Sequence, residues 1–209
     1  YTYEYRFSAK ILGERMQKHD TLAFDLFAMV CDDAVVRGGE PVLVGSVLDI
    51  NALGKDGNSF RKEIIQMAQG YVEAAKEARV AVINGEVAEL GVRVGGYGNF
   101  NYNWSSGAVW FAQKERLFTG FEIKENDSVV TLQEKGFRSN GLSLTRRVFK
   151  NAFGENWHEE KLEGKKLGEL VLHPSRIYSG IVSDLFGGFA GEPIAEIHGV
   201  AHITRGGIP

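Results

Sequence analysis

The fold prediction rests on one stretch of sequence, HDTLAFDLFAMVCDDAVVRGGEP, which covers residues 19–41. Asp20 or Thr21 can cap a helix in this stretch. The helix is predicted to continue to about Arg37, where a pair of glycines ends it. Residues 41–50 then have the apolar composition of a strand. A helix that leads directly into a strand is typical of α/β and α+β proteins.

The predicted helix is apolar nearly all round, yet it carries three carboxylates, Asp25, Asp32 and Asp33. At roughly 100° per residue, Asp25 and Asp32 lie about 20° apart and Asp33 lies about 80° from Asp25. Unpaired carboxylates on a buried helix are costly, so they need a cation, hydrogen-bond donors or water. Mg²⁺ that bridges to phosphates is one solution. The alternatives are that this side faces solvent or is paired with arginines.

Outward from this stretch, predicted strands and helices alternate. Residues 59–78 form the clearest amphipathic helix, because apolar side chains recur every three or four residues. Further helices are predicted at residues 140–149 and 175–186, and further strands at residues 80–83, 108–113, 128–132 and 194–203. The first of these strands is expected to be short and buried. Residues 91–106 have no clear period, and they are either a loop that covers a ligand or the rim of a hairpin.

The composition favours a globular protein that acts on small molecules. The chain has 209 residues and a formal net charge of −3, without the basic excess typical of proteins that bind nucleic acids. No apolar run reaches the roughly 18 residues that span a bilayer, so we expect no membrane contact. The single cysteine, Cys31, favours a reducing compartment, which we take to be the cytoplasm. The ends at Tyr1 and Pro209 suggest a piece of a longer protein.

Residues 84–89, NGEVAE, directly follow the predicted strand at residues 80–83. In α/β proteins, ligands bind just beyond the carboxyl ends of strands. Glu86 would there be a carboxylate available to a metal ion. The simpler interpretation is a turn followed by solvent-exposed acids.

Two further segments suit the binding of anions. In GFRSNG, residues 136–141, Ser139 and Asn140 can cap the following helix and leave N–H groups free for a phosphate. Arg138 adds a guanidinium that can bind an anion with two parallel donors. In HITRGG, residues 202–207, a hydroxyl, an arginine and two glycines follow a predicted strand. Ordinary turns and domain linkers have similar compositions, so both interpretations stay open.

Taken in order, five segments resemble the AIR synthetase family. They are similar to the family's HDT…DLVAM…NDLVVQGAEP, GGETAEM, HSNGYSL, PTRIY and AHLTGGG. The corresponding segments here are residues 19–41, 84–89 (NGEVAE), 138–144 (RSNGLSL), 174–178 (PSRIY) and 201–207 (AHITRGG). Five matches in the same order are more specific than any one of them alone.

The resemblance implies a phosphoribosylformylglycinamidine cyclo-ligase of purine biosynthesis. In that reaction ATP activates the formyl amide oxygen of formylglycinamidine ribonucleotide, and an internal nitrogen closes the ring to give aminoimidazole ribonucleotide, ADP and phosphate. The implied fold is α/β (α+β), with a mixed sheet packed by helices that pairs across a homodimer. Residues 1–170 would be the ATP-binding, dimerising N-terminal domain. Residues 171–209 would be the start of a truncated C-terminal domain.

The resemblance also implies roles for particular residues. The metal ligands would be the carboxylates Asp32, Asp33 and Glu86. The nucleotide would be bound by Asp33 and Glu86 together with Thr204, Gly206 and Gly207. The catalytic group beside the substrate would be Arg138, Ser139 and Asn140. These residue types suit phosphoryl transfer, which needs cations on the phosphates and positioned donors more than covalent help.

Arg138 stands where the family commonly has histidine, and Arg205 stands where it has glycine. Arginine stays protonated and cannot exchange a proton near neutral pH. We therefore predict that Arg138 binds the substrate phosphate or the transferred phosphoryl group and is not an acid–base catalyst. The alternative is an ion pair with Glu134 or another acid.

Two other functions remain open from the sequence. One is a different ATP-dependent enzyme of the same superfamily, such as a thiamine-monophosphate kinase, a selenophosphate synthetase or a hydrogenase-maturation protein. The other is a non-catalytic, nucleotide-binding dimerisation domain. The two arginine replacements favour the second, as does the lack of the family's glycine-rich TDGVGTK strand before His19.

Overall fold

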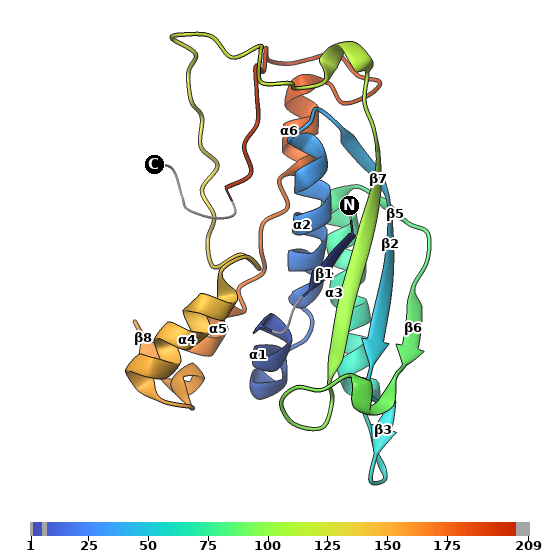
Figure 1. The fold of residues 1–209 in the computed structure, drawn as a ribbon, viewed down its shortest axis with the longest axis vertical. Coiled ribbons are helices and arrows are strands. Elements are labelled where there is room, and N and C mark those ends of the chain that lie inside the picture. Colours follow the sequence, from blue (N-terminus) through green and yellow to red (C-terminus); the bar gives the residue numbers. More distant parts are fainter. Residues whose placement is uncertain (1, 6–7, 204–209) are drawn as a thin grey trace.

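The computed structural model describes residues 2–5 and 8–203 of the chain. A sheet is covered by two long helices, and shorter helices and extended chain lie beside them (Figure 1). No helix in this part of the chain is long and apolar enough to cross a membrane. In chain order the elements are β1 (Thr2–Tyr5), α1 (Ser8–Met16), α2 (Leu22–Val35), β2 (Glu40–Ile50), β3 (Gly54–Lys55), β4 (Asn58–Ser59), α3 (Arg61–Ala78), β5 (Ala81–Val82), β6 (Glu86–Glu89), η1 (Gly91–Arg93), β7 (Tyr102–Phe111), η2 (Lys114–Arg116), α4 (Leu142–Phe153), η3 (Trp157–Glu159), β8 (Lys161–Leu162), β9 (Lys165–Lys166), α5 (Leu167–Val171) and α6 (Ser179–Phe186).

The central helix is α2, which confirms the helix predicted from the opening stretch. Eleven of its 14 residues are buried, so it contacts other elements on nearly every side. Thr21 is at the N-cap position, but its side chain makes no capping hydrogen bond. After the helix, Gly38 has a φ of 75°, and a Cβ there would lie 2.5 Å from the carbonyl oxygen of Arg116. The turn into β2 therefore requires glycine.

The sheet is mixed, as predicted, and β2 is at its centre. On one side β2 pairs antiparallel with β7, from Glu40 opposite Phe111 to Ile50 opposite Tyr102. β7 in turn pairs antiparallel with β1. On its other side β2 pairs parallel with β5 and then with β6.

Both long helices cover the same face of the sheet. The ring of Trp104 on β7 stacks on Tyr71 of α3, with 5.3 Å between centroids. Tyr71 in turn meets Phe27 of α2 edge-on at 4.9 Å. Because side chains alternate along a strand, the neighbouring positions point to the opposite face, where Val47 and Val109 are exposed in this single chain.

Residues 117–203 form a second region with less regular structure. α4 packs against α1 and η3, and α6 packs against α2. A small apolar cluster joins this region to α2, and its members are Val35, Phe118, Val182 and Phe186. The helix predicted at residues 140–149 is confirmed as α4. The helix predicted at residues 175–186 begins only at Ser179.

The strands predicted at residues 128–132 and 194–203 are wrong, since the chain is irregular in both places. Val129 and Val130 are 87% and 83% exposed. β-branched side chains favour a strand only where a partner strand and a packing surface are available. Here the segment runs along the outside of the molecule without either (Figure 1).

Two other predictions are partly wrong. The strand predicted at residues 80–83 is only Ala81–Val82, and it is exposed rather than buried because it lies at the edge of the sheet. β7 begins at Tyr102, so the second half of residues 91–106 is neither a loop nor a rim. Its aromatic side chains, including Trp104 at 6% exposed, belong to the core.

Candidate functional site

The acidic side of α2 is where three separate segments of the second region meet the first. Asp25 accepts a hydrogen bond from Ser175 Oγ. Asp32 contacts Arg138 and the start of α6, and Asp33 contacts His202. The sequence singled out three separate motifs, and one residue of each, Arg138, Ser175 and His202, therefore contacts the same helix.

Asp32 is surrounded by donors from the protein. Its Oδ2 accepts a hydrogen bond from Arg138 Nη2 at 2.9 Å. Its Oδ1 accepts the backbone N–H groups of Tyr178 and Ser179, each at 2.9 Å. Both oxygens are thus engaged, which does not favour Mg²⁺ at the same atoms. The carboxylate of Asp32 is therefore stabilised by an arginine and by backbone donors, which the sequence analysis left open as alternatives to a cation.

Arg138 links Asp32 of α2 to Glu134, which lies four residues before the arginine in the chain. Its Nη1 donates to Glu134 Oε2 at 2.8 Å and to the carbonyl oxygen of Arg176 at 2.9 Å. The guanidinium also lies over the ring of Tyr178, 5.5 Å from its centroid. The alternative prediction, a pair with Glu134, is therefore present in the structure. Anion binding by Arg138 stays a prediction.

Burial and charge oppose each other at this pair. Burial raises the pKa of Asp32 to about 6, while the positive charge of Arg138 and the backbone donors limit the rise. The pKa of Arg138 is raised above its usual value by the carboxylates of Asp32 and Glu134, although burial acts in the opposite direction. The guanidinium is therefore a fixed positive charge, as the sequence predicted, and does not titrate near neutral pH.

Asp33 lies one position further along α2 and is more accessible. Its Oδ1 is 2.8 Å from His202 Nδ1, and 28% of its side chain is exposed. Three of the predicted nucleotide-binding residues come after His202 in the chain and lie outside the described residues. They are Thr204, Gly206 and Gly207.

Ser139 and Asn140 do not cap α4 as the sequence suggested. Gly141 is the N-cap residue, with a φ of 91°, and no side chain makes a capping hydrogen bond. Ser139 Oγ is buried and has no hydrogen-bond partner in the described part of the chain. The N–H groups at the start of α4 are consequently not used by these two side chains.

Glu86 is not brought to the acidic side of α2. It lies on the edge strand β6, where it pairs with Val47 of β2. Since paired residues point to the same face, its side chain is on the face away from α2. In residues 2–5 and 8–203, no three His, Cys, Asp or Glu side chains are close enough to hold a metal ion. The roles of Asp32, Asp33 and Glu86 as metal ligands stay a prediction. Within the described residues of one chain, these three carboxylates do not come together to form a metal site.

Sequence reasoning missed several residues of this site. Ser175 and the N–H groups of Tyr178 and Ser179 were given no role, and Glu134 was named only as an alternative partner of Arg138. The PSRIY segment was recognised only as a motif. A signal was present, because three carboxylates on an apolar helix require donors elsewhere in the chain.

The chain is similar to known proteins over almost all its length. Residues 3–105 match the family described as AIR synthase related protein, N-terminal domain. The chain is 38% identical over 199 residues to the phosphoribosylformylglycinamidine cyclo-ligases of Streptococcus sanguinis (strain SK36) and Streptococcus gordonii (strain Challis), covering 94% of this chain and 53% of each relative. It therefore spans about half the length of the curated relatives it matches.

A solved structure supports the fold. The HypE–HypF complex contains a chain that aligns with 79% of this one at a TM-score of 0.51, with 14% identity and 46% of that chain covered. The matched family segment, residues 3–105, runs from β1 into β7 and contains the acidic helix α2. With the sheet, the helix and the sequence in agreement, the chain belongs to the family of AIR synthase related proteins.

Proposed function

We propose that the full-length protein is an ATP-dependent phosphoribosylformylglycinamidine cyclo-ligase. It would convert formylglycinamidine ribonucleotide and ATP to aminoimidazole ribonucleotide, ADP and phosphate, in the purine pathway of the cytoplasm. The observation that carries the proposal is the 38% identity to cyclo-ligases over 199 residues. Because it covers 94% of the chain, this similarity continues well past residue 105, where the family match ends, and includes the segments that carry Arg138 and Ser175.

The other enzymes of the superfamily are less well supported. The HypE–HypF likeness is at 14% identity and concerns the fold. Fold alone does not determine function, because one fold hosts many activities. The cyclo-ligase similarity is the more specific observation, since an alignment over 94% of the chain includes the segment that brings Arg138 to α2.

For the nucleotide, we keep Asp33 and Glu86 as ligands of Mg²⁺–ATP, with Thr204, Gly206 and Gly207 lining the nucleotide cleft. The contact of His202 with Asp33 supports part of this assignment, because it brings the described end of the chain to one of the proposed ligands. Carboxylate oxygens are suitable Mg²⁺ ligands, and the ion would offset negative charge on the phosphates.

Near the substrate, Arg138, Ser139 and Asn140 are the residues we assign to catalysis. The buried hydroxyl of Ser139, which has no partner in the described residues, is a donor that a substrate could use. Arg138 still has N–H donors on Nε and Nη2 beyond its contacts to Asp32, Glu134 and Arg176. Its remaining capacity suits an anion, and its present contacts fix the loop that carries Ser139.

We further propose that the protein is a homodimer that pairs its sheets. The sheet face away from α2 and α3 carries exposed apolar side chains in the single chain, with Val47 at 37% and Val109 at 47%. A second copy would cover this face and the sheet edge. Sedimentation of the full-length protein should give a dimer, and a monomer at tens of micromolar, on the order of weak-dimer affinities, would contradict this.

The activity is tested by ADP release from the full-length protein with ATP and formylglycinamidine ribonucleotide. ADP release that depends on this substrate, with formation of the imidazole product, is expected. Asp33→Asn and Glu86→Gln should each weaken Mg²⁺–ATP use, whereas Glu125→Gln, which removes the same charge from an exposed position, should not. Unchanged turnover in both site variants would remove the metal assignment. A protein that binds ATP without turnover would instead be the non-catalytic domain.

A further inference from the structure

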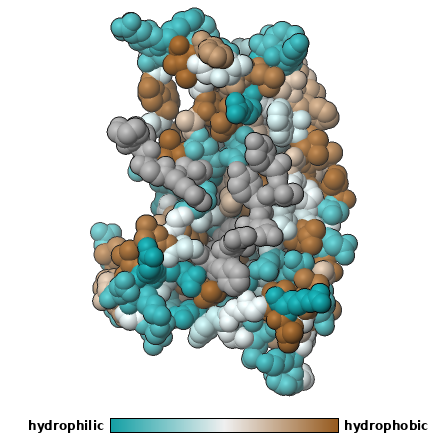
Figure 2. Space-filling model, viewed as in Figure 1, coloured by the Kyte–Doolittle hydropathy of each residue, from teal (hydrophilic) through white to brown (hydrophobic). Residues whose placement is uncertain are grey.

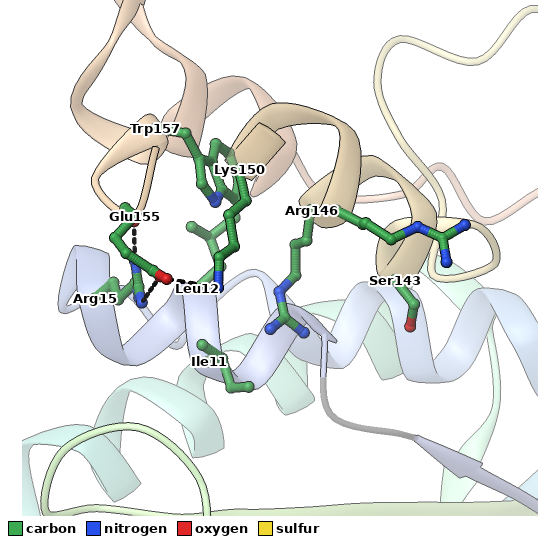
Figure 3. A pocket seen from close by; sticks show the side chains of 9 residues that line it. Ile11, Leu12, Arg15, Ser143, Arg146, Lys150, Glu155 and Trp157 are labelled. Carbon is green, nitrogen blue, oxygen red and sulfur yellow. Dashed lines mark hydrogen bonds and ion pairs between the residues drawn. The ribbon is translucent and has the colours of Figure 1, made fainter. Parts of the chain in front are cut away.

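A cavity of about 250 Å³ lies between α1 and α4 (Figure 3), and neither Asp32 nor Asp33 lines it. Its apolar wall includes Leu12, which is 1% exposed, and Trp157, which is 4% exposed. Pockets for drug-sized ligands hold roughly 300–1,000 Å³. The cavity is therefore suited to a small group, such as a phosphorylated sugar, rather than a whole nucleotide.

One face of α4 supplies most of the polar wall. Ser143, Arg146, Arg147 and Lys150 all line the cavity, and their spacing of three, four and seven residues places them on one side of a helix. Like charges four residues apart, as in Arg146 and Lys150, destabilise a helix. From the opposite side α1 adds Arg15 (Figure 3). This is an unfavourable gathering of cations unless negative charge offsets it.

The cavity itself supplies too little negative charge. Its one lining carboxylate is Glu155, which pairs with Lys150 at 2.5 Å and more distantly with Arg15 at 3.9 Å. Arg15 also donates to the carbonyl oxygen of Glu155 and lies 4.5 Å from the ring centroid of Tyr97. The carboxylate of Glu155 is thus already paired with Lys150 and Arg15, and the contacts of Arg15 with Glu155 and Tyr97 fix its position.

Arg146 and Arg147 are the cations left over. Within the part of the chain that the structure describes, the half-buried side chain of Arg146 and the exposed side chain of Arg147 make no hydrogen bond or ion pair. Burial lowers the pKa of Arg146, and the nearby charge of Arg15 lowers it further. An anion in the cavity would stabilise the charged guanidinium of Arg146 and so offset both its burial and the repulsion from Arg15. A guanidinium with free N–H groups binds phosphate through two parallel hydrogen bonds.

We propose that this cavity binds the phosphate group of a phosphoribosyl compound, with Arg146 and Arg147 as the phosphate ligands. Arg15 and Lys150 add positive charge, and the apolar wall of Leu12 and Trp157 keeps water from one side and so strengthens these contacts. The identity of the sugar rests on the proposed function. The binding of a phosphate monoester rests on the cavity alone.

The test measures binding of ribose 5-phosphate, ribose and ATP to the full-length protein by calorimetry. Ribose 5-phosphate should bind and ribose should not. Arg146→Gln should weaken ribose 5-phosphate binding roughly tenfold or more, as expected for the loss of a charged hydrogen bond. Arg61→Gln makes the same change at an exposed position on α3 and should have no effect. ATP binding should be the same in all three proteins.

Equal binding of ribose 5-phosphate and ribose would overturn the proposal, and so would equal behaviour of Arg146→Gln and Arg61→Gln. If Arg146→Gln weakens ATP instead, the phosphate belongs to the nucleotide and the phosphoribosyl assignment is wrong. If that variant does not fold, the wild type decides: the second pKa of a phosphate monoester is about 6, so its affinity should fall below this pH. A flat profile would contradict the site.

The two proposals can fail separately. Binding of ribose 5-phosphate without any cyclo-ligase turnover would keep the cavity and remove the proposed function. Substrate-dependent ADP release that Arg146→Gln leaves unchanged in both KM and kcat would keep the function and remove the cavity.

Discussion

Residues 2–111 and residues 117–203 are held to α2 in different ways. The first region packs apolar and aromatic side chains of the sheet and α3 against the helix. Part of the second region packs into the same core, but the second region also has a small apolar cluster on α2 and three polar attachments, at Asp25, Asp32 and Asp33. Apolar packing is non-directional and cumulative, whereas a charged hydrogen bond depends on one geometry. On the face of the molecule shown in Figure 2, hydrophilic and hydrophobic residues are interspersed over the whole surface. The position of the second region thus depends on directional contacts with three carboxylates of one helix as well as on apolar packing.

The largest effect is expected from Phe27→Ala, at the centre of the first region. Phe27 is 0% exposed, and truncating a buried Phe costs about 3–5 kcal/mol. Because α2 is shared, both regions should unfold at a lower denaturant concentration. Val92→Ala, at a fully exposed side chain, is the matched control. A loss confined to residues 117–203 would contradict the shared role of α2.

The free energy of unfolding should depend on pH with opposite signs in the two regions, because the pKa of one histidine in each region is shifted in an opposite direction. Burial lowers the pKa of His19, in the first region, from 6.5 to about 4. Its contribution to the free energy of unfolding is therefore present above pH 6.5 and lost as the pH falls through about 4. At about 1.4 kcal/mol per pKa unit, the loss is roughly 3 kcal/mol. In the second region, Glu196 and Asp127 raise the pKa of His198, so its contribution is present at low pH and lost as the pH rises.

Denaturant unfolding from pH 4 to 8 tests both signs. His19→Gln should flatten the acid limb, and His198→Gln should leave that limb in place. If both variants change the profile in the same direction, the assignment of opposite signs fails.

Asp32→Asn should act on the second region alone. It leaves Arg138 with one carboxylate, Glu134, and weakens the acceptor for the N–H groups at the start of α6. Losing one partner of a buried charged contact costs about 1–3 kcal/mol. Hydrogen exchange should rise at Tyr178 and Ser179 while the amides of β2 and β7 stay protected. Asp56→Asn, in an exposed turn, should change neither, and loss of protection throughout the sheet would contradict a local attachment.

The smallest effect is expected from Arg79→Gln. Arg79 at the end of α3 pairs with Asp184 of α6 at 2.8 Å, and their side chains are 61% and 49% exposed. Exposed pairs contribute about 0–1 kcal/mol, so the unfolding midpoint should barely move. A shift as large as that of Asp32→Asn would mean that surface pairs, and not α2, position the second region.

The regions also differ in how well the sequence predicted them. α2, α3 and β2 were predicted nearly to their ends. α3 has a strong apolar period, α2 lies between a candidate cap and a pair of glycines, and β2 has a continuous apolar composition. Residues 128–132 have the composition of a strand, but composition does not show whether a partner strand is present. Glu86 was grouped with Asp33 by family resemblance. Only the register with Val47 shows that it points to the other face of the sheet.

The pairing of β1 with β7 has a consequence for how the chain is made. Tyr5 lies opposite Trp104, so roughly a hundred residues must leave the ribosome before the first strand can find its partner. Synthesis at about 5–20 residues per second makes this a delay of several seconds. During that time β2 has no β7 beside it, and its apolar edge is open to other chains. Nascent protein should therefore depend on chaperones most while the segment between β2 and β7 is being translated.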